Sequence, residues 1–144
     1  MKTYNLKREF NWRGDVAELL AKHEYKARRT KGYDFLKDSN FSAKDNTFLK
    51  RYWHNIDLYG CDDSGQLAIY EVKARTPEVT RRPDITSSSL AAYRQAIAQQ
   101  IKAYLIIVTF HENWEVSFSI EDFDETRFRV NDGGYYRKRY KSAA

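Results

Sequence analysis

A glutamate and a lysine lie two residues apart at the end of an apolar run, in the sequence LAIYEVKA of residues 67–74. Because side chains alternate along a strand, Glu71 and Lys73 point to one face and Val72 to the other. An acid and a base on a strand face that would ordinarily fill a core indicate a catalytic or metal-binding site. The carboxylate can bind a metal ion, and the lysine can orient or deprotonate a water molecule.

A second carboxylate joins them if the strands on either side of the turn CDDSG form a hairpin. A turn centred near Ser64 places Asp57 opposite Glu71, whereas a slip of one residue would move Asp57 to the wrong face. Two buried carboxylates this close must share a proton or a cation. Mg²⁺, with Mn²⁺ as a substitute, accepts such oxygens, and the backbone carbonyl of Val72 is a further candidate ligand.

The surrounding elements predict an α/β protein, with helices against a mixed sheet. Residues 14–29 are expected to form a helix whose apolar face holds Val16, Leu19, Leu20, His23 and Ala27. A second helix is expected over residues 86–104, with an apolar side formed by Leu90, Tyr93, Ile97, Ile101 and Tyr104. The expected strands are residues 32–38, 55–60, 66–74, 105–110 and 114–120, and residues 39–46 are expected to form a loop.

The chain of 144 residues, 42% of them hydrophobic, suits a single domain over residues 1–144. We expect its core at about residues 13–120 and a basic, aromatic tail at about residues 127–144. No apolar run is long enough to span a membrane, and the polar start has no signal-peptide core, which favours a cytoplasmic protein. Cys61 is the only cysteine, which excludes an internal disulfide and a cysteine-rich metal site.

A net charge of +5 favours an anionic partner. Basic residues gather at 22–31, at 75–82 and in the tail, where tyrosines interleave with cations as in sites that neutralise phosphates and stack bases. A solvated tail that only aids solubility would look the same. The candidate DNA contacts are Arg13, Arg28, Arg29, Arg75, Arg81, Arg82, Arg137, Lys138 and Arg139.

The order of Asp57, thirteen residues, then Glu71-Val72-Lys73 resembles the signature of the PD-(D/E)xK nuclease superfamily, although Ile56 stands where the family name has proline. The sequence RGDVAELL of residues 13–20 resembles the first-helix motif of archaeal-type Holliday junction resolvases, which implies that Glu18 joins the site. The sequence QQIKAY is similar to the Gln-x-x-x-Tyr element of nucleases related to the exonuclease domain of bacterial recombination helicases. That similarity makes Gln100 and Tyr104 possible accessory residues.

The resemblance implies a restriction-endonuclease-like fold, a three-layer α/β/α core with a central mixed sheet flanked by helices. It also implies a Mg²⁺-dependent endonuclease, selective for branched DNA, that leaves a 5′-phosphate and works as a homodimer. Asp57, Glu71 and the carbonyl of Val72 would bind the metal. Lys73 would orient the attacking water, and Glu18 would complete the site.

Several alternatives stay open. The chain could be a restriction-type, homing or single-strand-specific nuclease, a non-catalytic nucleic-acid-binding module, or an RNA-directed nuclease or partner-binding protein. Glu18 could cap its helix together with Asp15. Glu71 and Lys73 could form a surface ion pair.

Overall fold

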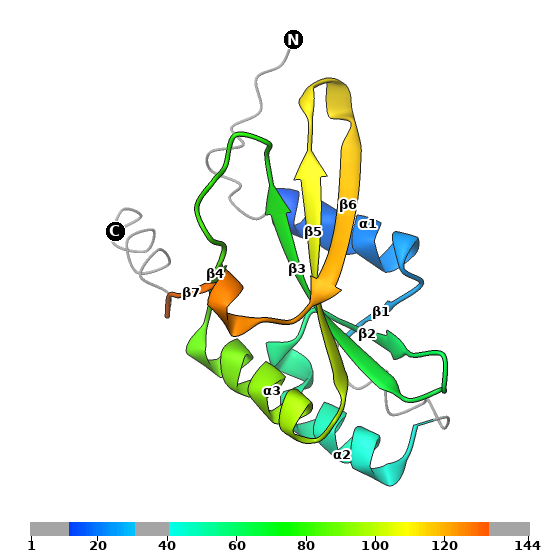
Figure 1. Ribbon diagram of the computed structural model, residues 1–144. Helices are drawn as coiled ribbons and strands as arrows, with labels where there is room; N and C mark the ends of the chain where they lie inside the picture. The colour runs from blue at the N-terminus through cyan, green and yellow to red at the C-terminus, as the bar shows by residue number, and fades with distance from the viewer. Residues whose placement is uncertain (1–11, 31–40, 133–144) are drawn as a thin grey trace, which may run out of the picture.

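The computed structural model describes residues 12–30 and 41–132 of the chain. These residues form a mixed α/β structure, shown in Figure 1. The predicted strand at residues 32–38 lies outside the described part. The helices and strands are, in chain order, α1 (Trp12–Glu24), β1 (Arg28–Arg29), α2 (Ala43–Tyr52), β2 (Leu58–Cys61), β3 (Leu67–Arg75), β4 (Asp84–Ile85), α3 (Ser87–Ala98), β5 (Lys102–Phe110), β6 (Val116–Asp122) and β7 (Arg129–Val130).

Five strands form one sheet in the order β1-β2-β3-β5-β6. The central pair, β3 and β5, is parallel, and the other neighbours are antiparallel, so the sheet is mixed as predicted. β4 and β7 form a separate parallel pair. The predicted hairpin is present as β2 and β3. Its turn is held by the Asp62 carboxylate, which accepts hydrogen bonds from the backbone N–H groups of Ser64 and Gln66 at 2.9 Å each.

The two faces of the sheet carry separate apolar clusters. On one face, Ala17 and Ala21 of α1 pack with Leu58, Tyr70 and Val108 of the sheet. On the other face, the residues that pack together come from α2, α3 and the alternate positions of the strands, among them Phe48, Leu49, Leu90, Tyr93, Ile69, Leu105 and Ile107. β3 and β5 lie between these clusters, which explains why their sequences are apolar on both sides.

The predicted loop at residues 39–46 is wrong in its second half, because α2 begins at Ala43. The side chain of Ser42 caps this helix by accepting a hydrogen bond from the N–H of Asp45 at 3.1 Å. The Asp45 carboxylate is buried and accepts the N–H of Leu67, 3.1 Å away, at the start of β3. Ser42 and Asp45 are of residue types that usually indicate a loop. In this protein Ser42 caps α2, and Asp45 connects α2 to β3.

Both long predicted helices end earlier than expected. α1 ends at Glu24 instead of residue 29, and α3 ends at Ala98 instead of residue 104. Each end has a residue with positive φ, Lys26 at 53° and Gln100 at 63°, followed by a backbone bond that closes the last turn. These are Schellman-type ends, which usually carry glycine at that position, so the sequence lacked the ordinary stop signal.

The predicted apolar face of α1 is also wrong in phase. Ala17 and Ala21 are fully buried, whereas Leu19 is 48% exposed and His23 is exposed. Alanines let the helix lie close to the sheet, while half-buried Leu20 packs against the same cluster and Leu19 points outward. In α3, Leu90 and Tyr93 are buried as predicted, and Ile97 is 51% exposed.

Beyond the predicted core, Phe123 and Phe128 are buried and stack on each other with ring centroids 5.1 Å apart. The segment that follows β6 is therefore packed onto the same core before it reaches β7. Among the described residues, no helix has the length and apolar character needed to cross a membrane.

Candidate active site

The site is built where β3 continues past the start of β2. The paired residues run from Leu58 opposite Tyr70 to Cys61 opposite Leu67, which confirms the predicted register of the hairpin. Asp57 lies at a bend one residue before β2, next to Glu71 in this register. Its carboxylate accepts a hydrogen bond from the backbone N–H of Val72 at 2.8 Å, which ties Asp57 to the free edge of β3.

Glu71 is a buried carboxyl group, with 4% of its surface exposed. Burial, then the charge of Asp57 and a hydrogen bond to the Asp57 carboxyl group, raise the pKa of Glu71 well above its ordinary value. A hydrogen bond between two carboxyl groups needs a proton between them. Buried Glu71 and half-buried Asp57 therefore form a pair in which the protonated form of Glu71 is favoured in the absence of a cation.

Lys73 lies two residues beyond Glu71 and, by strand alternation, on the same face of β3. It is half-buried, and its charge lowers the pKa of Glu71, against the larger effects of burial and Asp57. The ammonium group thus acts on the carboxyl pair, as the sequence predicts for a lysine beside a metal site.

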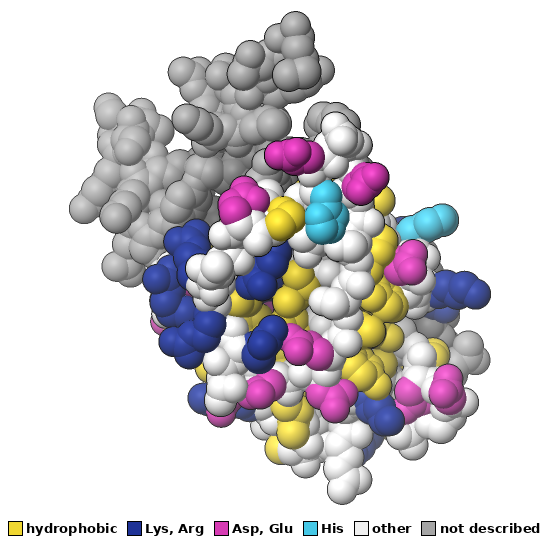
Figure 2. Space-filling model, turned by 45° about the horizontal axis from the view of Figure 1, so that its top comes forward, with side chains coloured by type: hydrophobic (Ala, Val, Ile, Leu, Met, Phe, Trp, Pro, Cys, Tyr) yellow, Lys and Arg dark blue, Asp and Glu magenta, His cyan; other side chains and the backbone are white. Residues whose placement is uncertain are grey.

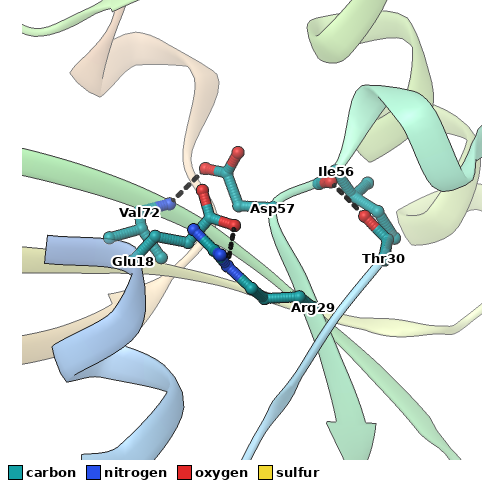
Figure 3. Close-up of polar contacts among 6 residues, drawn as sticks. All are labelled: Glu18, Arg29, Thr30, Ile56, Asp57 and Val72. Atoms are coloured by element: carbon teal, nitrogen blue, oxygen red, sulfur yellow. Dashed lines mark hydrogen bonds and ion pairs between the residues drawn. The ribbon is translucent and has the colours of Figure 1, made fainter. Parts of the chain in front are cut away.

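Glu18 reaches the site from α1. Figure 3 shows its carboxylate close to Asp57 and Val72 and bonded to Arg29 of β1. The Arg29 Nε donates to Glu18 Oε1 at 3.1 Å, in a half-buried ion pair. Burial and the charge of Asp57 raise the pKa of Glu18, and Arg29 opposes them in part. α1 begins at Trp12, so Asp15 and Glu18 lie inside the helix and the alternative that they cap its start is wrong.

The strand that carries Arg29 is anchored beside the site. The buried hydroxyl of Thr30 donates to the carbonyl of Ile56 at 2.8 Å. Ile56 is the residue before Asp57, and Arg29 pairs with Leu58, the residue after it. This bond, visible in Figure 3, fixes the segment that carries Asp57 relative to the strand that carries Arg29.

The donor atoms of the site suit a hard divalent cation. Asp57 and Glu71 offer carboxylate oxygens, and the carbonyl of Val72 lies on the same side of β3 as the N–H that bonds Asp57. Within residues 12–30 and 41–132, no three His, Cys, Asp or Glu side chains form a group that could hold a metal ion. A cation here would therefore use two carboxylates together with backbone or water oxygens, as the sequence predicts with Val72.

The structure does not bring Gln100 and Tyr104 to this site. Gln100 is exposed in the turn after α3. Tyr104 lies in β5 opposite Tyr70 and stacks on it with ring centroids 5.6 Å apart. Both tyrosines share the sheet face that packs against α1, which is opposite to the face of Glu71. The prediction that Gln100 and Tyr104 lie on one helix is wrong, because α3 ends at Ala98 and Tyr104 belongs to β5.

The candidate basic residues divide into three groups. Arg29 is part of the site, whereas Arg28 lies 5.9 Å over the ring of Tyr59. Arg75, Arg81 and Arg82 belong to the end of β3 and the following loop. In Figure 2, Lys and Arg side chains gather on the left of the face in view, the side where Figure 1 places β4 and that loop. The side chain of Arg13, and Arg137, Lys138 and Arg139, lie outside the described part.

Two neighbours of the carboxyl pair were missed as site residues. Thr30 has no sequence signal beyond its place after two arginines. Tyr93 was predicted as core and is fully buried, but the charges of Glu71 and Asp57 act on its hydroxyl and, after burial itself, raise its pKa. A tyrosine at core spacing on a helix looks the same whether its hydroxyl is used or not.

Comparisons with protein-family models, with curated proteins and with solved structures found no match to this chain. The resemblance to PD-(D/E)xK nucleases therefore stays a prediction carried by the residues themselves. The geometry of the carboxyl pair and its neighbours is the basis for assigning a function.

Proposed function

We propose that this chain is a Mg²⁺-dependent nuclease that hydrolyses phosphodiester bonds in DNA. The observation that carries the proposal is the pairing of buried Glu71 with half-buried Asp57, with Lys73 on the same strand face as Glu71. A buried carboxyl group beside a second one is unfavourable as packing alone, because Glu71 loses its hydration and is repelled by the charge of Asp57. A divalent cation between the two oxygens would remove their repulsion and give the pair a use.

Each residue of the site has a role in this proposal. Asp57, Glu71 and the carbonyl of Val72 would hold the cation, which when bound would stabilise charge on the phosphate and acidify a bound water. Lys73 would orient the attacking water and stabilise the developing negative charge. Glu18 would complete the site directly or through water, while Arg29 holds its carboxylate in place.

The proposed fold is the three-layer, restriction-endonuclease-like arrangement. It is supported by apolar clusters on both faces of the mixed sheet, one with α1 and one with α2 and α3. It is also supported by the hairpin that places Asp57 beside Glu71. The helix α2, between the first strand and Asp57, contributes Phe48 and Leu49 to the core.

For the substrate, we favour branched DNA cut by a homodimer to leave 5′-phosphates. The support is the resemblance of residues 13–20 to a resolvase motif and the arginines at the end of β3. Glu71, Lys73 and Arg75 occupy alternate positions of one strand, so a phosphate at the carboxyl pair would meet basic residues further along β3.

The test is a cleavage assay on end-labelled four-way junction, duplex, flap and single-stranded DNA, and on RNA, with Mg²⁺, Mn²⁺ or EDTA. The proposal expects metal-dependent cleavage of DNA, fastest on the four-way junction, that is lost in Asp57→Asn. Exposed Asp63→Asn, in the hairpin turn, is the matched control and should cut as the wild type does.

The other outcomes separate the alternatives. A preference for duplex or single strands would assign a nuclease of the same site chemistry with another target. Cleavage of RNA alone would contradict the DNA assignment. Binding of DNA without cleavage under any metal would favour a non-catalytic nucleic-acid-binding module and would overturn the proposal.

A further inference from the structure

Tyr93 carries a hydroxyl group that packing alone does not explain. It lies on α3 with none of its surface exposed, and its ring stacks on Phe123 with centroids 4.4 Å apart and planes 8° from parallel. The hydroxyl oxygen is buried and has no hydrogen-bond partner among the described residues. The backbone of Asp57 lowers the pKa of Tyr93 against the larger effect of burial, so the phenol lies next to the segment that carries Asp57.

Tyr93 and Glu71 share one face of the sheet, because α3 packs on the face that carries Ile69 and Glu71 is the next residue of β3 on that face. After burial itself, the charges of Glu71 and then Asp57 raise the pKa of Tyr93, so both carboxyl groups lie within electrostatic reach of the phenol. A phenolic O–H is a donor and a carboxylate oxygen is an acceptor. Full burial and the stack on Phe123 restrict the orientation of the ring that carries this donor.

A buried hydroxyl without a partner is unfavourable, and phenylalanine would fill the same space without that penalty. The partner that would satisfy it is a carboxylate oxygen, once the two carboxyl groups no longer bond to each other. A cation between Asp57 and Glu71 would produce that state.

We propose that Tyr93 is a positioning residue, whose hydroxyl donates a hydrogen bond to the Asp57–Glu71 pair when the pair holds a divalent cation. Such a bond, on the side away from the cation, would fix the orientation of the carboxylates from behind. The inference rests on the proposed function, since it requires that the pair binds a metal.

The test is direct binding of Mn²⁺ and Mg²⁺, by calorimetry and by the rise in Tm on adding metal, for the full chain and Tyr93→Phe. The substitution keeps the stacked ring and removes only the oxygen. We expect the apparent Kd for metal to rise about 10-fold or more, while the Tm without metal stays the same or increases.

Tyr70→Phe is the matched control, because Tyr70 precedes Glu71 on β3 and faces the other side of the sheet. It should bind metal as the wild type does. Metal affinity of Tyr93→Phe equal to the wild type would overturn the positioning role while leaving the proposed function intact. A Tm that falls without metal, with unchanged metal affinity, would show a purely structural hydroxyl. A wild type that binds neither metal would overturn the proposed function and this inference with it.

Discussion

Glu71 carries a carboxyl group at a position where its strand would ordinarily place an apolar side chain. Its neighbours along the same face are Ile69 and Lys73, and its partner across the hairpin is Asp57. The sequence predicts this meeting because the turn CDDSG fixes the register: Asp62 bonds two backbone N–H groups, and Gly65 takes a φ of 81°. The hydroxyl of Tyr93 could not be predicted, because helical spacing identifies a buried ring and says nothing of its oxygen.

The raised pKa of Glu71 makes stability depend on pH. Without metal, the folded protein keeps the Glu71 proton above the ordinary pKa of 4.5, while the unfolded chain releases it. The free energy of unfolding therefore decreases as pH rises from about 4.5 to the raised pKa. Glu71→Gln should remove this part of the pH dependence and raise the metal-free Tm at neutral pH. The measurement is Tm from pH 4 to 8 without metal, with the exposed Glu115→Gln as the control variant. A dependence of Tm on pH that is the same in Glu71→Gln as in the wild type would contradict the raised pKa of Glu71.

At the scale of elements, the site depends on contacts between segments that are short and polar. β1 has only two residues, Arg28 and Arg29, and is held near Asp57 by the bond from Thr30 to Ile56. Such a strand has too few residues to be recognised from alternation. The ends of α1 and α3 could not be predicted either, because Lys26 and Gln100 take a positive φ at a position that usually carries glycine. The long apolar strands β3 and β5 and the hairpin could be predicted because their patterns extend over many residues.

Thr30→Val tests this anchor. Valine has the same shape as threonine but leaves the buried carbonyl of Ile56 without its donor, which costs about 1–3 kcal/mol. We expect a lower Tm and a weaker apparent Mg²⁺ affinity, because Asp57 follows Ile56 directly. Thr47→Val is the matched control, since its hydroxyl makes a bond of the same 2.8 Å length to Ala43 but is exposed within α2. Equal Tm changes in the two variants would show that the anchor does not support the site.

Across the whole molecule, the arginines of β3, of the loop that follows it and of the segment around β7 have two kinds of environment. Arg75 and Arg82 donate to the backbone carbonyls of Arg81 and Thr126. Arg127 and Arg129 form ion pairs with Glu121 and Asp84, at 3.1 and 2.9 Å. A carboxylate neutralises the charge of a guanidinium, whereas a backbone carbonyl does not. Arg75 and Arg82 therefore suit phosphate contact better than Arg127 and Arg129.

DNA binding at several salt concentrations tests this division. Each lost phosphate contact should flatten the slope of log K against log salt by about 0.9 for duplex DNA. The double variant of Arg75→Ala and Arg82→Ala should lose about two contacts, whereas the double variant of Arg127→Ala and Arg129→Ala should change the slope little. The reverse order would place the nucleic-acid surface elsewhere.

The nuclease site is tested most directly by the single-turnover cleavage rate of four-way junction DNA in Mg²⁺, for the wild type and Lys73→Ala, together with DNA affinity in EDTA. We expect Lys73→Ala to lower the rate by about 10²–10⁴-fold and to leave affinity unchanged. Lys102→Ala, at the other end of the sheet, should keep both. No cleavage by the wild type, or equal rates for the wild type and Lys73→Ala, would contradict the assignment of a nuclease site.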